Sequence, residues 1–139
     1  MSDADSTVLA TLDTSLLMRS SAAFLAVIGL GASLFPRLAL SHLGASTGAP
    51  AVLVVSVLGA QALGNAVMNW MARDTLIGGI YSRPVALGNA THFAAGAVVL
   101  GQAIVTGPVR LGLVGLAGGY LVFAAGFGVV VFGGGGQCG

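Results

Sequence analysis

The sequence carries very little charge. Nine of its 139 residues are Asp, Glu, Lys or Arg, whereas a soluble domain has about a quarter of its residues charged, because its surface faces water. This shortage excludes an ordinary soluble domain. The charge is also unevenly spread, because no charged residue occurs in four long stretches: residues 20–35, 50–72, 84–109 and 111–132.

Cysteine and acidic side chains are almost absent as well. Cys138 is the only cysteine, which excludes an internal disulfide and a zinc site built on cysteines. The four uncharged stretches offer no carboxylate for general acid catalysis or for metal binding. We therefore expect no metal, no cofactor and no catalytic residue. The formal net charge of +1 gives no basic surface for nucleic acid.

Apolar residues make up 56% of the chain. The hydrocarbon core of a bilayer is about 30 Å thick and takes about 20 helical residues to cross. Each uncharged stretch approaches or exceeds that length, and lipid favours helices because they pair their own backbone groups. All four prolines lie at the edges of these stretches, where proline is tolerated or ends a helix. The predicted spans run over about residues 16–35, 50–72, 84–105 and 111–132.

Three parts follow from this pattern. A polar N-terminal segment covers residues 1–13, a four-helix transmembrane domain covers 14–132, and a Gly-rich, flexible tail covers 133–139. Because a short loop makes adjacent spans antiparallel, we predict an all-α integral membrane four-helix bundle with up-down-up-down topology. Residues 37–49, between the first two spans, mix Leu with Ser and His. We expect that segment to lie along the membrane interface.

The connection between the second and third spans holds the densest charge in the chain. Amphipathic rings favour the depth of the lipid headgroups, so the aromatic residues beside this connection mark the same interface. Arg and Asp side chains there can pair with one another or with headgroups. The predicted headgroup-facing residues are Trp70, Arg73, Asp74, Tyr81 and Arg83.

Five arginines bear on the orientation of the chain. Arg19, Arg73 and Arg83 fall on the side of both termini, whereas Arg37 and Arg110 fall on the other side. Cytoplasmic loops carry an excess of Arg and Lys. This small excess predicts a multi-pass protein of the cell membrane with both termini in the cytoplasm.

Polar residues in the second and third spans follow helical spacing. Steps of four residues place Gln61, Asn65 and Asn69 on one slanted stripe, and Asn89 and His92 share a face of the next span. At 1.5 Å per residue, Asn69 and Asn89 both lie about 6–8 Å deep, Asn65 and His92 about 12 Å. Antiparallel spans could therefore form a ladder of matched polar pairs. The stripe either holds helices together by hydrogen bonds or lines a path for a ligand or solute.

His92 is the one ionisable residue well inside a span. Such residues are functional candidates, because a histidine can relay a proton or bind a metal. The other interpretation is a neutral imidazole bonded to Asn65 or to a backbone carbonyl. No carboxylate lies near it in the sequence to orient it as a base.

The run Asn69-Trp70-Met71-Ala72-Arg73, followed by Arg83-Pro84 and by Gly88-Asn89 with His92, resembles a pattern in other proteins. These are small, uncharacterised four-span membrane proteins of prokaryotes. The resemblance covers the second and third spans only. It implies a compact four-helix bundle and no particular activity.

These observations leave two functions open. The first is a non-enzymatic structural or accessory component, whose partners are the lipid bilayer and other membrane subunits or further copies of the chain. The alternative is a small carrier or channel subunit with a polar path between the second and third spans. An enzyme is not expected, because nucleophilic catalysis needs a nucleophile activated by a nearby base.

Overall fold

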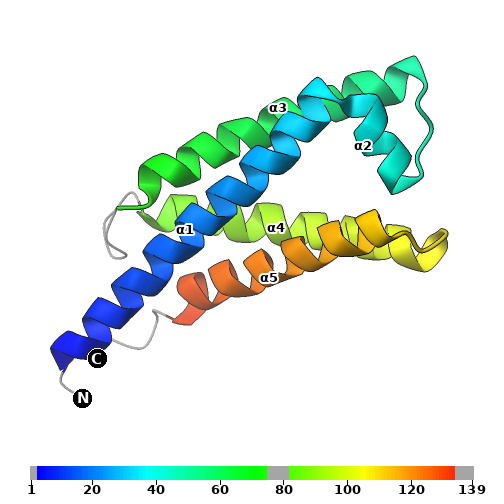
Figure 1. Cartoon of the computed structure of the whole chain (residues 1–139). Coiled ribbons are helices and arrows are strands. Elements are labelled where there is room, and N and C mark those ends of the chain that lie inside the picture. The colour runs from blue at the N-terminus through cyan, green and yellow to red at the C-terminus, as the bar shows by residue number, and fades with distance from the viewer. Residues whose placement is uncertain (1–2, 75–81, 134–139) are drawn as a thin grey trace.

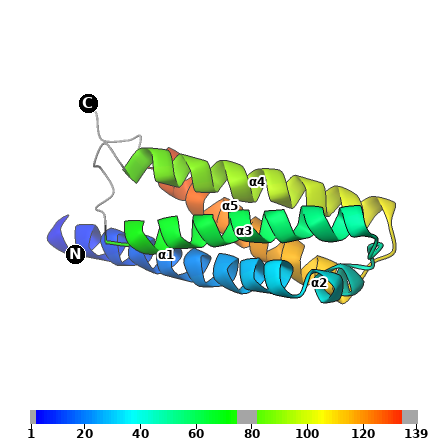
Figure 2. The same ribbon diagram turned by 90° about the horizontal axis from the view of Figure 1, so that it is seen from above.

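The computed structural model describes residues 3–74 and 82–133, and within these residues every regular element is a helix. Four of these helices are long. They gather into a bundle with the short helix at one end, as Figures 1 and 2 show. Along the chain the long helices alternate in direction, as the colour ramp of Figure 1 shows. The predicted all-α fold is confirmed. The helices are α1 (Asp3–Leu34), α2 (Pro36–Leu43), α3 (Ala49–Ala72), α4 (Ser82–Thr106) and α5 (Leu111–Gly133).

Each long helix is long and apolar enough to cross a membrane. The four spans agree closely with the predicted ones, and large apolar side chains such as Val27, Val57 and Val122 are exposed on them. Exposed apolar surface on every long helix suits lipid as the surroundings. The chain is a multi-pass membrane protein, with spans Thr14–Leu34, Ala49–Ala72, Arg83–Thr106 and Leu111–Phe132.

α1 is longer than its predicted span. The helix begins at Asp3 rather than near residue 16. No proline or glycine occurs before Gly29, so nothing ends the helix between the polar segment and the span. At its other end α1 stops before Phe35, because Pro36 disfavours the helical conformation in the residue that precedes it.

The predicted Gly-rich tail is described only at its first residue. Gly133 belongs to α5, and residues 134–139, with Cys138, lie outside the described residues.

The first half of the predicted interfacial segment, residues 37–43, belongs to α2, which begins at Pro36. Pro36 occupies its first turn, and Gly44 ends it with a left-handed φ of 73°. The backbone amides of Gly44 and Ala45 donate to the carbonyls of Ser41 and Leu40, at 3.1 and 2.9 Å. A β-carbon on Gly44 would overlap the side chain of Arg110. The short helix is therefore fixed at its end by a contact with the α4–α5 connection.

The long helices pack as two close pairs, α1 with α3 and α4 with α5. Glycines bring the first pair together: a β-carbon on Gly59 would lie 2.6 Å from the backbone N of Ser33. On the α1 side, a β-carbon on Gly29 would lie 2.8 Å from the carbonyl O of Gly59. Such small residues let helix backbones approach closely.

Aromatic rings fill the space between the two pairs. Phe93 of α4 and Phe127 of α5 are fully buried and stacked, with ring centroids 5.8 Å apart. Phe24 of α1 reaches into the same cluster, 6.4 Å from Phe93. Ala62 and Ala66 of α3 complete this core. The core therefore joins all four spans.

Candidate functional site

A reciprocal pair of carboxamides lies at the centre of the polar residues. Nδ2 of Asn69 on α3 donates to Oδ1 of Asn89 on α4 at 2.8 Å, and Nδ2 of Asn89 donates back to Oδ1 of Asn69 at 2.7 Å. Asn69 is 0% exposed and Asn89 2%. The structure thus brings together one of the two pairs whose depths matched in the sequence.

Ser21 of α1 adds a third helix to this pair. Its hydroxyl accepts the second N–H of Asn69 at 3.0 Å and donates to the carbonyl of Met18 at 3.0 Å. The second N–H of Asn89 goes to the carbonyl of Val85 at 2.9 Å. We call Ser21, Asn69 and Asn89 the buried polar network.

Every hydrogen-bond donor of the buried polar network has a partner inside the protein. A carboxamide has two N–H donors and one carbonyl oxygen, and a hydroxyl has one donor; all of these are used. Among the described side chains no buried polar atom lacks a partner. A network without a spare donor holds three helices in one arrangement, and has no N–H left to offer a ligand.

The other predicted pair does not form. Asn65 of α3 accepts from Gln61 of the same helix at 3.5 Å, whereas His92 contacts α5. Two physical reasons explain this. Positions three apart differ by about 60° around a helix, so Asn89 faces α3 while His92 turns toward α5. In addition α3 packs mainly on α1 and α4 mainly on α5, which leaves few contacts along the α3–α4 boundary.

His92 is partly buried among aromatic rings. Its Nε2 lies 3.4 Å from the hydroxyl of Tyr120, and its ring lies 5.2 Å from that of Phe93. Gly96, one turn further along α4, makes room for Tyr120, because a β-carbon there would overlap the tyrosine ring. The partner of His92 is thus a neutral phenol. An imidazole held by a phenol lacks the carboxylate that commonly orients a catalytic histidine.

Gln61 and Asn65 lie at the outer side of α3. Gln61 is exposed and Asn65 is partly exposed. Their mutual hydrogen bond, at 3.5 Å, is near the limit of useful length. The predicted stripe is therefore divided, with Asn69 inside the bundle and Gln61 at its surface.

Charged and aromatic residues gather where α3 ends. Nε of Arg73 lies 3.2 Å from Oδ2 of Asp74, and Nη2 of Arg19 on α1 lies 3.5 Å from Oδ1 of the same carboxylate. The Arg73 guanidinium also lies 4.6 Å from the ring centroid of Trp70. These exposed contacts connect α1 to α3 at one end of the bundle. Arg83 is exposed at the start of α4, and Tyr81 lies outside the described residues.

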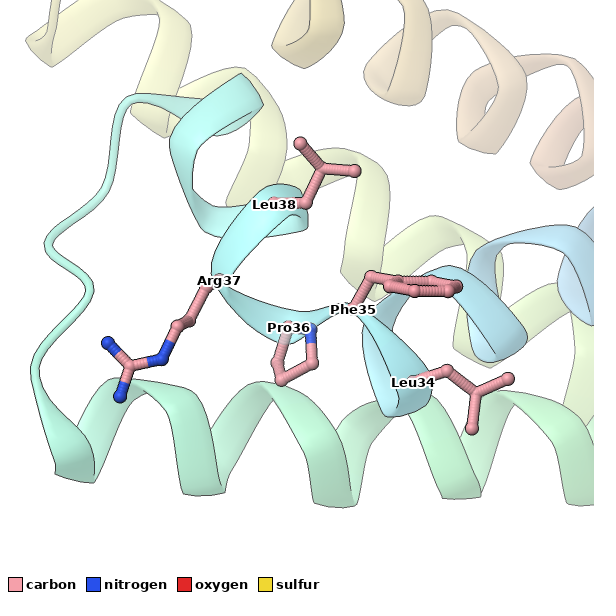
Figure 3. A pocket seen from close by; sticks show the side chains of 5 residues that line it. All are labelled: Leu34, Phe35, Pro36, Arg37 and Leu38. Carbon is pink, nitrogen blue, oxygen red and sulfur yellow. The ribbon is translucent and has the colours of Figure 1, made fainter.

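A shallow groove occurs at the junction of α1 and α2. Leu34, Phe35, Pro36, Arg37 and Leu38 line it. Figure 3 shows that Arg37 extends away from Phe35 and Leu38. Because these side chains diverge, they do not converge on one ligand. Exposed apolar side chains next to an arginine instead suit the boundary between headgroups and hydrocarbon.

Metal chemistry has no cluster of ligands to use in the part of the chain that is described. No group of three His, Cys, Asp or Glu side chains that could bind a metal ion occurs there.

Comparison with known proteins gives no functional lead: no family model matches the chain, and neither a curated protein nor a solved structure does. The resemblance to prokaryotic four-span proteins stays a prediction.

Two residues of these contacts were not predicted from the sequence, Ser21 and Tyr120. Ser21 lies two residues after Arg19, near the start of the first span. Asn69 lies near the end of the second span, so the two residues have similar depths at the same side of the membrane. Tyr120 is the only tyrosine inside a predicted span. The sequence thus gives the depth of Ser21 and the position of Tyr120 inside a span. Neither property indicates which neighbouring helix the side chain faces.

Proposed function

We propose that this protein is a non-enzymatic structural or accessory component of a membrane. The observation that carries the proposal is the buried polar network, in which three hydrogen bonds connect α1, α3 and α4. Its two remaining donors bond carbonyls of their own helices. Interhelical hydrogen bonds of this kind stabilise membrane bundles. The polar residues inside the bundle therefore serve its architecture.

The location of the remaining polar residues also supports a structural role over transport within one chain. A polar path between α3 and α4 would need Gln61, Asn65 and His92 on its walls. Gln61 is instead exposed, and His92 is directed to Tyr120. The space between the helix pairs is occupied by stacked aromatic rings such as Phe93 and Phe127.

The chemistry of the side chains supports a non-enzymatic role in the same way. Asp74, the one acidic residue outside the N-terminal segment, is paired with Arg19 and Arg73 at the bundle end. It is thus not available to orient His92 as a base. Lipid and other membrane subunits are the partners we propose, with no role for nucleic acid.

We place the protein in the cell membrane with both termini in the cytoplasm. Arg19 and Arg73 meet at Asp74, so they share one end of the bundle, to which the start of α1 also belongs. Arg110 contacts Gly44 at the other end, where Gly44 ends α2, the helix that contains Arg37. With Arg83, the first end carries the larger number of arginines, which favours the cytoplasmic side.

Flux measurements on purified protein in liposomes test the structural role against transport. We expect proton and small-solute flux equal to that of protein-free vesicles, because stacked aromatic rings such as Phe93 and Phe127 occupy the bundle interior. His92→Ala is the matched variant and should leave this baseline unchanged. Flux in the wild type that His92→Ala abolishes, with helical content retained, would contradict the proposal and favour a carrier or channel.

A further inference from the structure

The outward face of α3 carries a regular stripe of exposed residues. Their spacing alternates between three and four positions, which is the spacing of a seam between two packed helices. The opposite face of the same helix repeats this pattern inward, where Gly59, Ala62, Ala66 and Asn69 are buried. We call the outward set the α3 stripe: Val54, Val57, Gln61, Gly64, Met68 and Met71, all exposed.

Gln61 stands at the midpoint of α3, which spans Ala49–Ala72, and therefore at the middle of the membrane. Its amide carries two N–H donors and a carbonyl. One N–H reaches Oδ1 of Asn65 at the long distance of 3.5 Å, and the other N–H and the carbonyl have no partner in the described residues. Exposing such groups to hydrocarbon is costly, so a polar partner outside the chain is expected.

We propose that the α3 stripe is the interface with a second copy of this chain, oriented the same way in the membrane. Two copies related by an axis along the membrane normal place every residue at the same depth as itself. Gln61 then meets Gln61, and a carboxamide is self-complementary because it donates and accepts. Asn69 and Asn89 form the same reciprocal pairing inside the chain, at 2.8 and 2.7 Å.

Gly64 provides the space that this contact needs. A β-carbon added there would meet nothing within 4 Å, and the residue lies one turn from Gln61 on the same stripe. A glycine at a helix interface allows the two backbones to approach within reach of short polar side chains. One polar residue in an otherwise apolar seam also fixes the register of the two helices. The amide and the glycine thus favour the same partner.

Energy transfer in liposomes tests this interface. Donor and acceptor dyes are attached at Cys138, the only cysteine, and the protein is diluted stepwise with lipid. We expect a dimer whose dissociation constant in the membrane rises about three- to tenfold in Gln61→Leu, the scale of one to two interhelical amide bonds. Gly64→Ile should weaken it as well by separating the backbones. Gln102→Leu, an exposed glutamine on α4, is the matched control and should leave dimerisation unchanged.

Two results would overturn the interface. One is a wild-type protein that stays monomeric at every lipid dilution. The other is a dimer whose affinity neither Gln61→Leu nor Gly64→Ile alters. Circular dichroism of each variant checks that the bundle is folded, which is expected because positions 61 and 64 both lie on its outer surface.

Discussion

At the scale of single residues, the buried polar network stabilises the bundle mainly because each of its donors has a partner, and less through the sum of its hydrogen bonds. A polar contact between membrane helices contributes only about 0.6 kcal/mol on average. A buried donor or acceptor that loses its partner costs about 1–3 kcal/mol. Because Asn69 bonds both Ser21 and Asn89, its removal takes both interhelical bonds from the Asn89 amide and the donor that the Ser21 hydroxyl accepts.

Asn69→Leu should therefore lower the free energy of unfolding by about 1–3 kcal/mol. The double variant Asn69→Leu/Asn89→Leu should recover part of this loss, since the unpaired amide on α4 is removed as well. Thermal unfolding in mild detergent, followed by circular dichroism, measures both effects. Asn65→Leu is the matched control, because Asn65 bonds only Gln61 on its own helix and should change stability little. Equal losses for Asn65→Leu and Asn69→Leu would contradict the assignment.

One polar contact could be predicted from the sequence. The directions in which the other polar side chains face could not. Counting residues inward from the ends of the spans gives depth, which suffices to match Asn69 with Asn89. Depth leaves the rotation of each helix open, so the suggested Asn65–His92 pair was wrong. His92 faces Tyr120, and Ser21 supplies the third member of the network.

At the scale of helices, α1 and α3 pack through glycines at their crossing. Gly29 and Gly59 are buried there, and Gly59 lies against the backbone of Ser33. Ser33 also donates from its hydroxyl to the carbonyl of Ser56, at 3.3 Å. A backbone cannot move aside as a flexible side chain does, so this crossing has no room for a larger residue.

Gly59→Ala should destabilise the protein by about 1–3 kcal/mol, the usual cost of overpacking. The added methyl would lie 2.6 Å from the Ser33 backbone N and force the two helices apart. Gly31→Ala is the matched control, because its methyl would meet nothing within 4 Å. It should leave stability unchanged or raise it slightly, since alanine favours helices. The melting temperatures of the two variants in detergent measure this difference. A Gly59→Ala variant as stable as Gly31→Ala would refute the close crossing.

The sequence predicted the helices well and their partners poorly. Absence of charge and the position of the prolines define the four spans, because lipid imposes length and composition on any crossing segment. Which spans pair is decided by local fit between small and large residues. With 23 glycines in the chain, small residues occur on many faces, and the sequence alone does not distinguish Gly59 from Gly64.

At the scale of the whole molecule, the bundle needs lipid as its surroundings. The core is a narrow zone of aromatic rings and the buried polar network, while large apolar side chains cover the outside of each long helix. In water that apolar outer surface would cause copies of the protein to aggregate. In a bilayer it is the surface that contacts the acyl chains, with the arginines near the two ends.

Fractionation of cells that express the chain tests this dependence most directly. After an alkaline carbonate wash, which strips peripheral proteins, we expect the chain in the membrane pellet and its release only by detergent. Recovery of a folded, monodisperse protein from the soluble fraction without any surfactant would contradict the account.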